Sequence, residues 1–274
     1  MTAPSGFVAL PDGASLAYEV HGEEHGGTPV LLLRPLVGGM SSWGAFRDVL
    51  AQRLRVIAFD PRGTGPSSDT DLTATTREMA RDAVSVLDAL AVPRAHVFGI
   101  SFGAMVATWM AIDCAARVDR LCLASAGPTG LSLAPSGFAR DVAMVASALL
   151  PGEEANARLP AVVLSENVRE DQPERARAIE AAAADEPTDR VELAKHALAA
   201  ARHDARAELD RIVAPTLVLG GDHDELLGEA PTIALAAAIP GARREVIANA
   251  GHDLTLEQPE ATARRVADFF LGTA

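Results

Sequence analysis

Six short and mainly apolar segments recur along the chain, and this recurrence constrains the fold more than any other feature. Uninterrupted apolar runs of this kind are typical of strands buried on both faces, as in a parallel sheet. Helical patterns separate several of them: residues 75–90 and 260–271 carry apolar side chains at the spacing of one helix face, and residues 102–115 follow a strand directly. Alternating strands and helices predict an α/β fold with a mostly parallel sheet and helices on both faces. The predicted strands comprise residues 30–33, 55–59, 95–100, 120–124, 216–220 and 244–248.

Two further predicted strands precede these segments. Residues 7–10 and 15–20 flank Pro11-Asp12-Gly13, which is a turn signal, so this stretch predicts a β-hairpin. The hairpin would add antiparallel strands at one edge of the sheet and bring the total to roughly eight strands. The chain has 274 residues, of which 49% are apolar. It is therefore long enough for one large α/β domain, or for a core domain with an insertion.

The alternation of strands and helices stops between residues 128 and 209. This stretch is rich in Ala, Arg and Glu and contains no convincing strand. We therefore expect residues 1–127 and 210–274 to form an α/β core and residues 128–209 to form a helical cap, or lid, over the strand ends. The alternative is an ordinary helical excursion with no gating role. The helical patterns of the segment cover residues 136–150, 173–184 and 189–201.

The net charge of −13 argues against two classes of partner. Nucleic-acid binding needs clustered Lys and Arg, so we expect neither nucleic acid nor an anionic membrane surface as a partner. No apolar run approaches the roughly 20 residues of a membrane-spanning helix, and the N-terminus lacks the basic and apolar regions of a secretory signal. These features predict a cytoplasmic protein with a small-molecule substrate, for which a homodimer is a possible assembly. No Cys/His cluster has zinc-ligand spacing, so we expect no metal.

The most specific local motif is Gly99-Ile100-Ser101-Phe102-Gly103, which lies between a predicted strand and a predicted helix. Serine is a weak nucleophile and must be presented where a base can reach it. A tight strand-to-helix turn does this, and glycines flank the serine because a Cβ would clash where strand and helix converge. The backbone N–H of Phe102 would then point, with the helix N-terminus, toward a developing oxyanion. The alternative is a glycine-rich turn without chemistry, but the strand–turn–helix context favours Ser101 as a nucleophile.

With this motif and three others, the sequence resembles the α/β-hydrolase family over almost its whole length. The resemblance implies an architectural role for the segment at 60–67. It implies that the segment at 215–224 delivers a triad acid, and that the segment at 250–259 delivers the triad histidine, His252. The chain order of serine, aspartate and histidine is the order expected for this fold. The resemblance implies no cofactor. The three segments are Asp-Pro-Arg-Gly-Thr-Gly-Pro-Ser at 60–67, Pro-Thr-Leu-Val-Leu-Gly-Gly-Asp-His-Asp at 215–224, and Ala-Gly-His at 250–252 with Glu-Gln-Pro at 257–259.

Two neighbouring aspartates compete for the role of the triad acid. In the family, a glycine, two further residues and then the acid follow one another, and Gly221 and Asp224 satisfy this spacing. Asp222 satisfies it only if the loop is counted differently, from Gly220. We prefer Asp224 as the acid that orients His252, with Asp222 as the alternative. The aspartate that is not used is expected to bond its own loop backbone.

The sequence departs from the family directly after its first buried strand. The family usually has His-Gly there, and the next backbone N–H completes the oxyanion hole, whereas this chain has Arg34-Pro35-Leu36. Proline has no N–H, but the donor normally belongs to the following residue, so we expect Leu36 to serve with Phe102. Arg34 has two interpretations. Its guanidinium either grips a substrate carboxylate or carbonyl, or forms an internal ion pair with a loop carboxylate such as Asp60.

Together these residues predict a cofactor-free serine hydrolase that cleaves a carboxylic ester or lactone through an acyl-enzyme. Ser101 would be the nucleophile, His252 the general base and Asp224 the acid that holds the imidazole. Enol-lactonases resemble the chain in layout and also vary at the His-Gly position. Alternatives on the same fold are a C–C bond hydrolase, an acyltransferase, and a cofactor-free lyase or cyclase; a further alternative is a non-catalytic ligand receptor. Because the predicted cap has a single aromatic residue, aliphatic side chains such as Val142 and Val145 are expected to line the substrate pocket.

Overall fold

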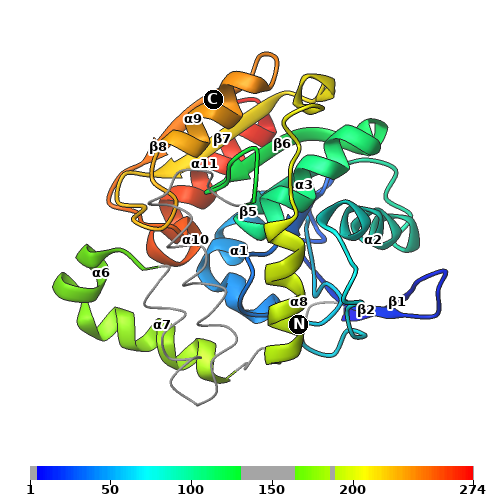
Figure 1. The fold of residues 1–274 in the computed structure, drawn as a ribbon, viewed down its shortest axis with the longest axis horizontal. Helices are drawn as coiled ribbons and strands as arrows, with labels where there is room; N and C mark the ends of the chain where they lie inside the picture. Colours follow the sequence, from blue (N-terminus) through cyan, green and yellow to red (C-terminus); the bar gives the residue numbers. More distant parts are fainter. Residues whose placement is uncertain (1–4, 131–163, 186–188, 274) are drawn as a thin grey trace.

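The computed structural model describes residues 5–130, 164–185 and 189–273. Its sheet has eight strands in the order β1-β2-β4-β3-β5-β6-β7-β8, and helices cover both faces of it (Figure 1). The predicted α/β class and the mostly parallel sheet of about eight strands are therefore confirmed. The strands are β1 (Ser5–Ala9), β2 (Ser15–His21), β3 (Val30–Leu33), β4 (Val56–Phe59), β5 (Ala95–Ile100), β6 (Val118–Ala124), β7 (Thr216–Gly221) and β8 (Arg243–Ile247). The α-helices outside segment 128–209 are α1 (Gly44–Ala51), α2 (Thr76–Ala89), α3 (Phe102–Asp113), α9 (Ala230–Ala238), α10 (Leu254–Glu257) and α11 (Pro259–Leu271).

The two N-terminal strands form the predicted hairpin. β1 and β2 pair antiparallel, from Ser5 opposite Glu19 to Ala9 opposite Ser15. β2 also pairs antiparallel with β4, whereas the remaining pairings in the sheet are parallel. The hairpin thus adds its antiparallel pairings at one edge, as the turn signal between the two strands predicted.

The central strands are apolar along their whole length because each supplies side chains to two cores. In β3, Leu31 and Leu33 belong to the core under α2 and α3, while Val30 and Leu32 belong to the core under α1 and α11. Successive side chains of a strand point to opposite faces of the sheet. An uninterrupted apolar run is therefore what a strand with helices on both faces requires.

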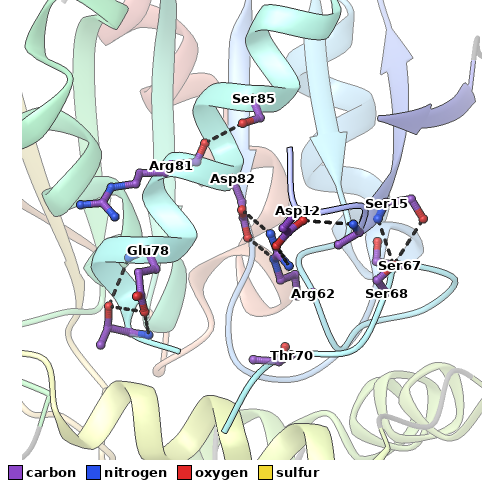
Figure 2. Close-up of polar contacts among 12 residues, drawn as sticks. Asp12, Ser15, Arg62, Ser67, Ser68, Thr70, Glu78, Arg81, Asp82 and Ser85 are labelled. Atoms are coloured by element: carbon purple, nitrogen blue, oxygen red, sulfur yellow. Dashed lines mark hydrogen bonds and ion pairs between the residues drawn. The ribbon is translucent and has the colours of Figure 1, made fainter. Parts of the chain in front are cut away.

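The turn that follows β4 ties the hairpin to the rest of the domain (Figure 2). The guanidinium of Arg62 pairs with Asp82 of α2, at 2.7 and 3.0 Å, and with Asp12 in the hairpin turn, at 2.6 Å. The hydroxyl of Ser67 accepts the backbone N–H of Ala17 in β2 at 2.9 Å. These bonds join β2, the turn and α2, in keeping with the architectural role that the family resemblance implied for this segment.

The described part of segment 128–209 contributes helices and no strand of the sheet. The helices predicted over 173–184 and 189–201 form as α7 and α8, whereas the prediction over 136–150 lies outside the described residues. Asp189 is the N-cap of α8, and its carboxylate accepts backbone N–H groups of the first turn. The division of the chain into core and cap stays a prediction. The helices of this segment are α6 (Glu166–Asp171), α7 (Pro173–Asp185) and α8 (Arg190–Ala201).

The direction of the strands decides where a site can form. β3, β5, β7 and β8 run parallel, so their carboxyl ends lie at one edge of the sheet. Residues 34–36 follow β3, Ser101 follows β5, Asp224 lies in the loop after β7, and His252 lies in the loop after β8. In open α/β sheets this edge is where ligands bind.

Candidate active site

Ser101 occupies the sharp turn between β5 and α3. Its backbone has φ 53° and ψ −117°, an unusual conformation for a side-chain-bearing residue, and such strain costs about 1–3 kcal/mol. Gly99 and Gly103 permit the turn: a Cβ at position 99 would overlap the carbonyl of Gly103, and a Cβ at position 103 would overlap the carbonyl of Leu33. The N–H of Ser101 donates to the carbonyl of Ala124 on β6 at 2.9 Å. The fold therefore holds the serine in a strained position where α3 begins.

The close approach of α3 to β3 predicts a large effect of one methyl group. We expect Gly103→Ala to lower the free energy of unfolding by about 3 kcal/mol or more, because the added Cβ meets backbone that cannot rotate away. Gly26→Ala is the matched control, since a Cβ there has open space around it. Urea denaturation of the two variants beside the parent measures the difference. Superimposable transitions for Gly103→Ala and Gly26→Ala would contradict this account of the turn.

His252 and Asp224 form a hydrogen-bonded series with Ser101. The Nε2 atom of His252 lies 2.9 Å from the hydroxyl oxygen of Ser101. The Nδ1 atom lies 3.0 and 3.2 Å from the two carboxylate oxygens of Asp224. An N–H on Nδ1 that donates to the carboxylate leaves Nε2 free to accept the serine proton. Three side chains from distant parts of the sequence thus meet at the carboxyl edge of the sheet.

The two aspartates of the β7 loop have different environments. Asp224 is buried, and besides His252 its carboxylate accepts the N–H groups of Leu226 and Leu227 at 3.1 and 2.8 Å. Burial alone raises the pKa of the Asp224 carboxyl, but His252 and these donors outweigh it and hold the pKa below its ordinary value. Asp222 is exposed and bonds His223 and the N–H of Ala250 instead. It is Asp224, therefore, that lies within hydrogen-bond distance of His252.

The electrostatic surroundings of His252 favour its protonated form. Burial acts to lower the pKa of the imidazole, but the carboxylate of Asp224 acts in the opposite direction, and Asp253 and Glu257 add to it. The net effect raises the pKa of His252 above its ordinary value of 6.5. The imidazolium that would form when His252 takes a proton is thus stabilised by a neighbouring charge.

A cavity of about 360 Å³ opens next to the three side chains, and Ser101 and His252 line it. This volume lies within the range of small-molecule sites. Leu36 and Phe102, the predicted oxyanion donors, line it as well, and their assignment stays a prediction. Val142 and Val145 lie outside the described residues, so their prediction also stays open. Lining residues that the sequence did not indicate include Val37, Trp43, Met105, Arg175, Ile179 and Leu226.

Arg34 lies behind the described lining of the cavity that contains Ser101. The residue is buried, and its Nη1 donates to the hydroxyl of Thr64 at 2.8 Å. It is absent from the described residues that line the cavity with Ser101, and borders a void of about 20 Å³ with Phe102 and Met79. This position favours the internal role of the guanidinium, and substrate binding by Arg34 stays a prediction.

The described residues were also compared with the requirements of a metal site and of a membrane-spanning helix. Across residues 5–130, 164–185 and 189–273, no group of three or more His, Cys, Asp or Glu side chains has the arrangement of a metal site. Within the same residues, no helix combines the length and apolar character needed to cross a bilayer.

Comparison with known proteins identifies the family. Residues 20–265 match the model of the alpha/beta hydrolase family, and the chain belongs to this family. It is 31% identical over 255 residues to the putative carbamate hydrolase RutD of Azorhizobium caulinodans, which covers 90% of this chain and 91% of that protein. It is 29% identical over 251 residues to 3-oxoadipate enol-lactonase 1 of Acinetobacter baylyi, with 90% of each covered. The crystal structure of the enol-lactonase from Burkholderia xenovorans LB400 matches with a TM-score of 0.85 at 27% identity, over 97% of this chain and 100% of that one. The protein is therefore an enzyme, a hydrolase with the α/β fold.

Proposed function

We propose that this enzyme is a cofactor-free serine hydrolase that cleaves a carboxylic ester or a lactone through an acyl-enzyme on Ser101. The observation that carries the proposal is the series of short contacts from Ser101 to His252 and from His252 to Asp224, at 2.9 and 3.0 Å. A serine bonded to an imidazole whose far nitrogen meets a carboxylate has the arrangement needed for nucleophilic attack.

The reaction proceeds in two halves. The hydroxyl oxygen of Ser101 attacks the substrate carbonyl while His252 takes the hydroxyl proton, and Asp224 stabilises the resulting imidazolium. The N–H groups of Phe102 and Leu36 bind the oxyanion. Collapse of the tetrahedral intermediate breaks the C–O bond, and His252 returns the proton to the leaving alkoxide. In a lactone this alcohol stays joined to the acyl group. A water molecule, deprotonated by His252, then attacks the acyl-enzyme and frees the acid and Ser101.

The cavity favours a substrate with an apolar acyl or alcohol part. Leu36, Val37, Trp43, Met105 and Leu226 supply much of its described lining. Burial of aliphatic substrate surface against such side chains contributes about 0.8 kcal/mol per CH₂. The likeness to the enol-lactonase of Acinetobacter baylyi supports a lactone or ester, since that relative is named for hydrolysis of a lactone.

A carbamate is the second candidate substrate. It is favoured by the likeness to the putative carbamate hydrolase of Azorhizobium caulinodans, at 31% identity over nine-tenths of the chain. The same attack by Ser101 on a carbamate carbonyl forms a carbamoyl-serine when the alcohol leaves, or an alkoxycarbonyl-serine when the amine leaves. Ester and carbamate hydrolysis would use the same side chains, so only a comparison of substrates can distinguish the two candidates.

A matched substrate panel tests the proposal. We expect kcat/KM for an aliphatic 4-nitrophenyl ester or a simple lactone to exceed that for a carbamate of equal size by about 10-fold or more. The acyl groups of 4-nitrophenyl pentanoate and 4-nitrophenyl N-propylcarbamate have equal chain length, and δ-valerolactone has the same five carbons in a ring. Preference for the carbamate would replace the ester or lactone assignment with the second candidate.

The environment of His252 also predicts the pH dependence of activity. The general base must be neutral, and its pKa is raised above 6.5, because the carboxylates around the buried imidazole outweigh the opposing effect of burial. We expect kcat/KM for 4-nitrophenyl acetate to be low in acid and to rise with pH through the pKa of His252 to a plateau. Stopped-flow or plate-reader rates between about pH 5 and 9 measure this limb. A profile that is flat across neutrality, or that falls as the pH rises, is incompatible with His252 as the base.

A further inference from the structure

The loop that carries His252 is bonded to helices of segment 128–209, and one buried carboxylate lies at the centre of this contact. Glu257, at the end of α10, has no solvent-exposed surface. One of its carboxylate oxygens accepts the backbone N–H of Ser165 at 2.7 Å, and the other accepts the Ser165 hydroxyl at 2.6 Å and the N–H of Gly251 at 2.9 Å. Ser165 is the N-cap of α6, and Gly251 immediately precedes His252.

A second helix contacts α10, the short helix that follows the loop of His252. Nη2 of Arg175, in α7, donates to the backbone carbonyls of Leu256 and Glu257 at 3.0 and 2.7 Å. Arg175 and its helix neighbour Ile179 also line the cavity that contains Ser101. Ser165 at the start of α6 and Arg175 in α7 therefore both bind α10 through polar contacts, and α10 follows directly on the loop of the proposed general base.

The chemistry of these contacts makes Glu257 sensitive to the position of both partners. A buried carboxylate is tolerated only when donors surround it, and the three groups that bond Glu257 are all donors. Burial raises the pKa of the Glu257 carboxyl above its ordinary value, and the bonds from Ser165 and Gly251 oppose this rise without cancelling it. Movement of Ser165 away from Glu257 leaves the carboxylate with fewer hydrogen-bond donors. The positions of Ser165 and Gly251 are therefore energetically coupled.

We propose that Glu257 is a positioning residue that sets the distance between Nε2 of His252 and the hydroxyl of Ser101. Through Glu257, this distance depends on the docking of α6. Glu257 holds the N–H of Gly251, and the peptide of Gly251 leads directly into His252. When Ser165 occupies its two bonds, the carboxylate and the loop are fixed, and Nε2 of His252 lies 2.9 Å from the serine hydroxyl. The inference rests on the proposed function of Ser101 and His252.

Kinetics of three single variants and one double variant test the coupling. Glu257→Gln is nearly isosteric, but one side of its amide is an NH₂ group that would face a donor. We expect it to lower kcat for 4-nitrophenyl acetate by about 10- to 100-fold, because small displacements of a catalytic base are costly. Ser165→Ala removes one donor and should lower kcat by a smaller factor. Exposed Glu260→Gln, in the next helix, is the matched control and should keep the parental kcat.

Non-additivity separates positioning from a general loss of stability. Coupled residues give a double variant whose loss is smaller than the product of the single losses, so Ser165→Ala should have little further effect on kcat when Glu257→Gln is already present. All rates are measured well below the melting temperature of each variant. A Glu257→Gln enzyme that is fully folded and retains kcat within about twofold of the parent overturns the inference, and so do effects that multiply in the double variant.

A spectroscopic readout distinguishes failure of this inference from failure of the proposed function. In ¹⁵N-labelled protein, Ser165→Ala should shift the amide resonance of Gly251 and the ring resonances of His252, whereas Glu260→Gln should leave them in place. Unshifted signals in Ser165→Ala overturn the coupling whatever the activity. The proposed function is tested separately by labelling of Ser101 in the parent enzyme with a fluorophosphonate, a reaction whose absence leaves the resonance test intact.

Discussion

Ser101→Ala is expected to lower kcat for ester hydrolysis by about 10⁴-fold or more while the protein stays folded. The variant lacks the oxygen that would form the acyl-enzyme, so only the residual effect of binding and of the oxyanion donors can remain. Initial rates with 4-nitrophenyl acetate measure the loss, and circular dichroism and the melting temperature verify the fold. The substitution removes only the hydroxyl group, so Gly99, Gly103 and the backbone of the turn stay as they are.

Ser125→Ala is a suitable control for the first prediction. Ser125 is buried and follows β6, and its backbone also has a positive φ, of 48°. It does not lie among the described residues that line the cavity with Ser101. We expect this variant to keep the parental kcat within about threefold. A purified Ser101→Ala sample that turns over substrate at a rate near that of Ser125→Ala would contradict covalent catalysis by Ser101.

Asp224→Asn is expected to lower kcat by about 10³- to 10⁴-fold, because the amide cannot stabilise the imidazolium of His252 and can favour the wrong tautomer. Loss of the negative charge also removes the main influence that raises the pKa of His252. The acid limb of kcat/KM should therefore move to lower pH as its plateau falls. A pH series on the purified variant measures both effects.

Asp222→Asn provides the matched control two residues away. The carboxylate of Asp222 bonds His223 and the N–H of Ala250 rather than His252. We therefore expect its replacement to change kcat by less than about fivefold and to leave the acid limb in place. The reverse outcome, a severe loss in Asp222→Asn with a mild loss in Asp224→Asn, would assign the triad acid to the other aspartate.

The sheet could be predicted closely because burial on two faces leaves a strong signal in the sequence. The runs over 30–33 and 95–100 coincide with β3 and β5, and the run over 244–248 is displaced by one residue from β8. The sequence patterns did not predict helices α1, α6, α9 and α10. α9 is made of apolar and small residues on all sides, so it shows no contrast between a buried and an exposed face. α10 is only four residues long, which is too short for a periodic pattern.

The candidate site was only partly predictable, for reasons of geometry. Ser101 and His252 each follow a parallel strand, and parallel strands bring their carboxyl ends to one edge of the sheet. The choice between Asp224 and Asp222 depends on how the loop after β7 turns, which a spacing pattern leaves open. The direction of the Arg34 side chain was equally undetermined. The contact of Glu257 with Ser165 joins residues 92 positions apart, and neither residue type signals it.

Mass spectrometry of the covalent adduct tests the central claim most directly. Incubation of the parent enzyme with a fluorophosphonate, followed by intact-mass measurement and peptide mapping, should show one phosphonyl group per chain, on the peptide that contains Ser101. The adduct should be absent from Ser101→Ala and should form slowly in Asp224→Asn. Continued hydrolysis of 4-nitrophenyl acetate by an enzyme that carries no label, or a label on another residue together with lost activity, would contradict the account.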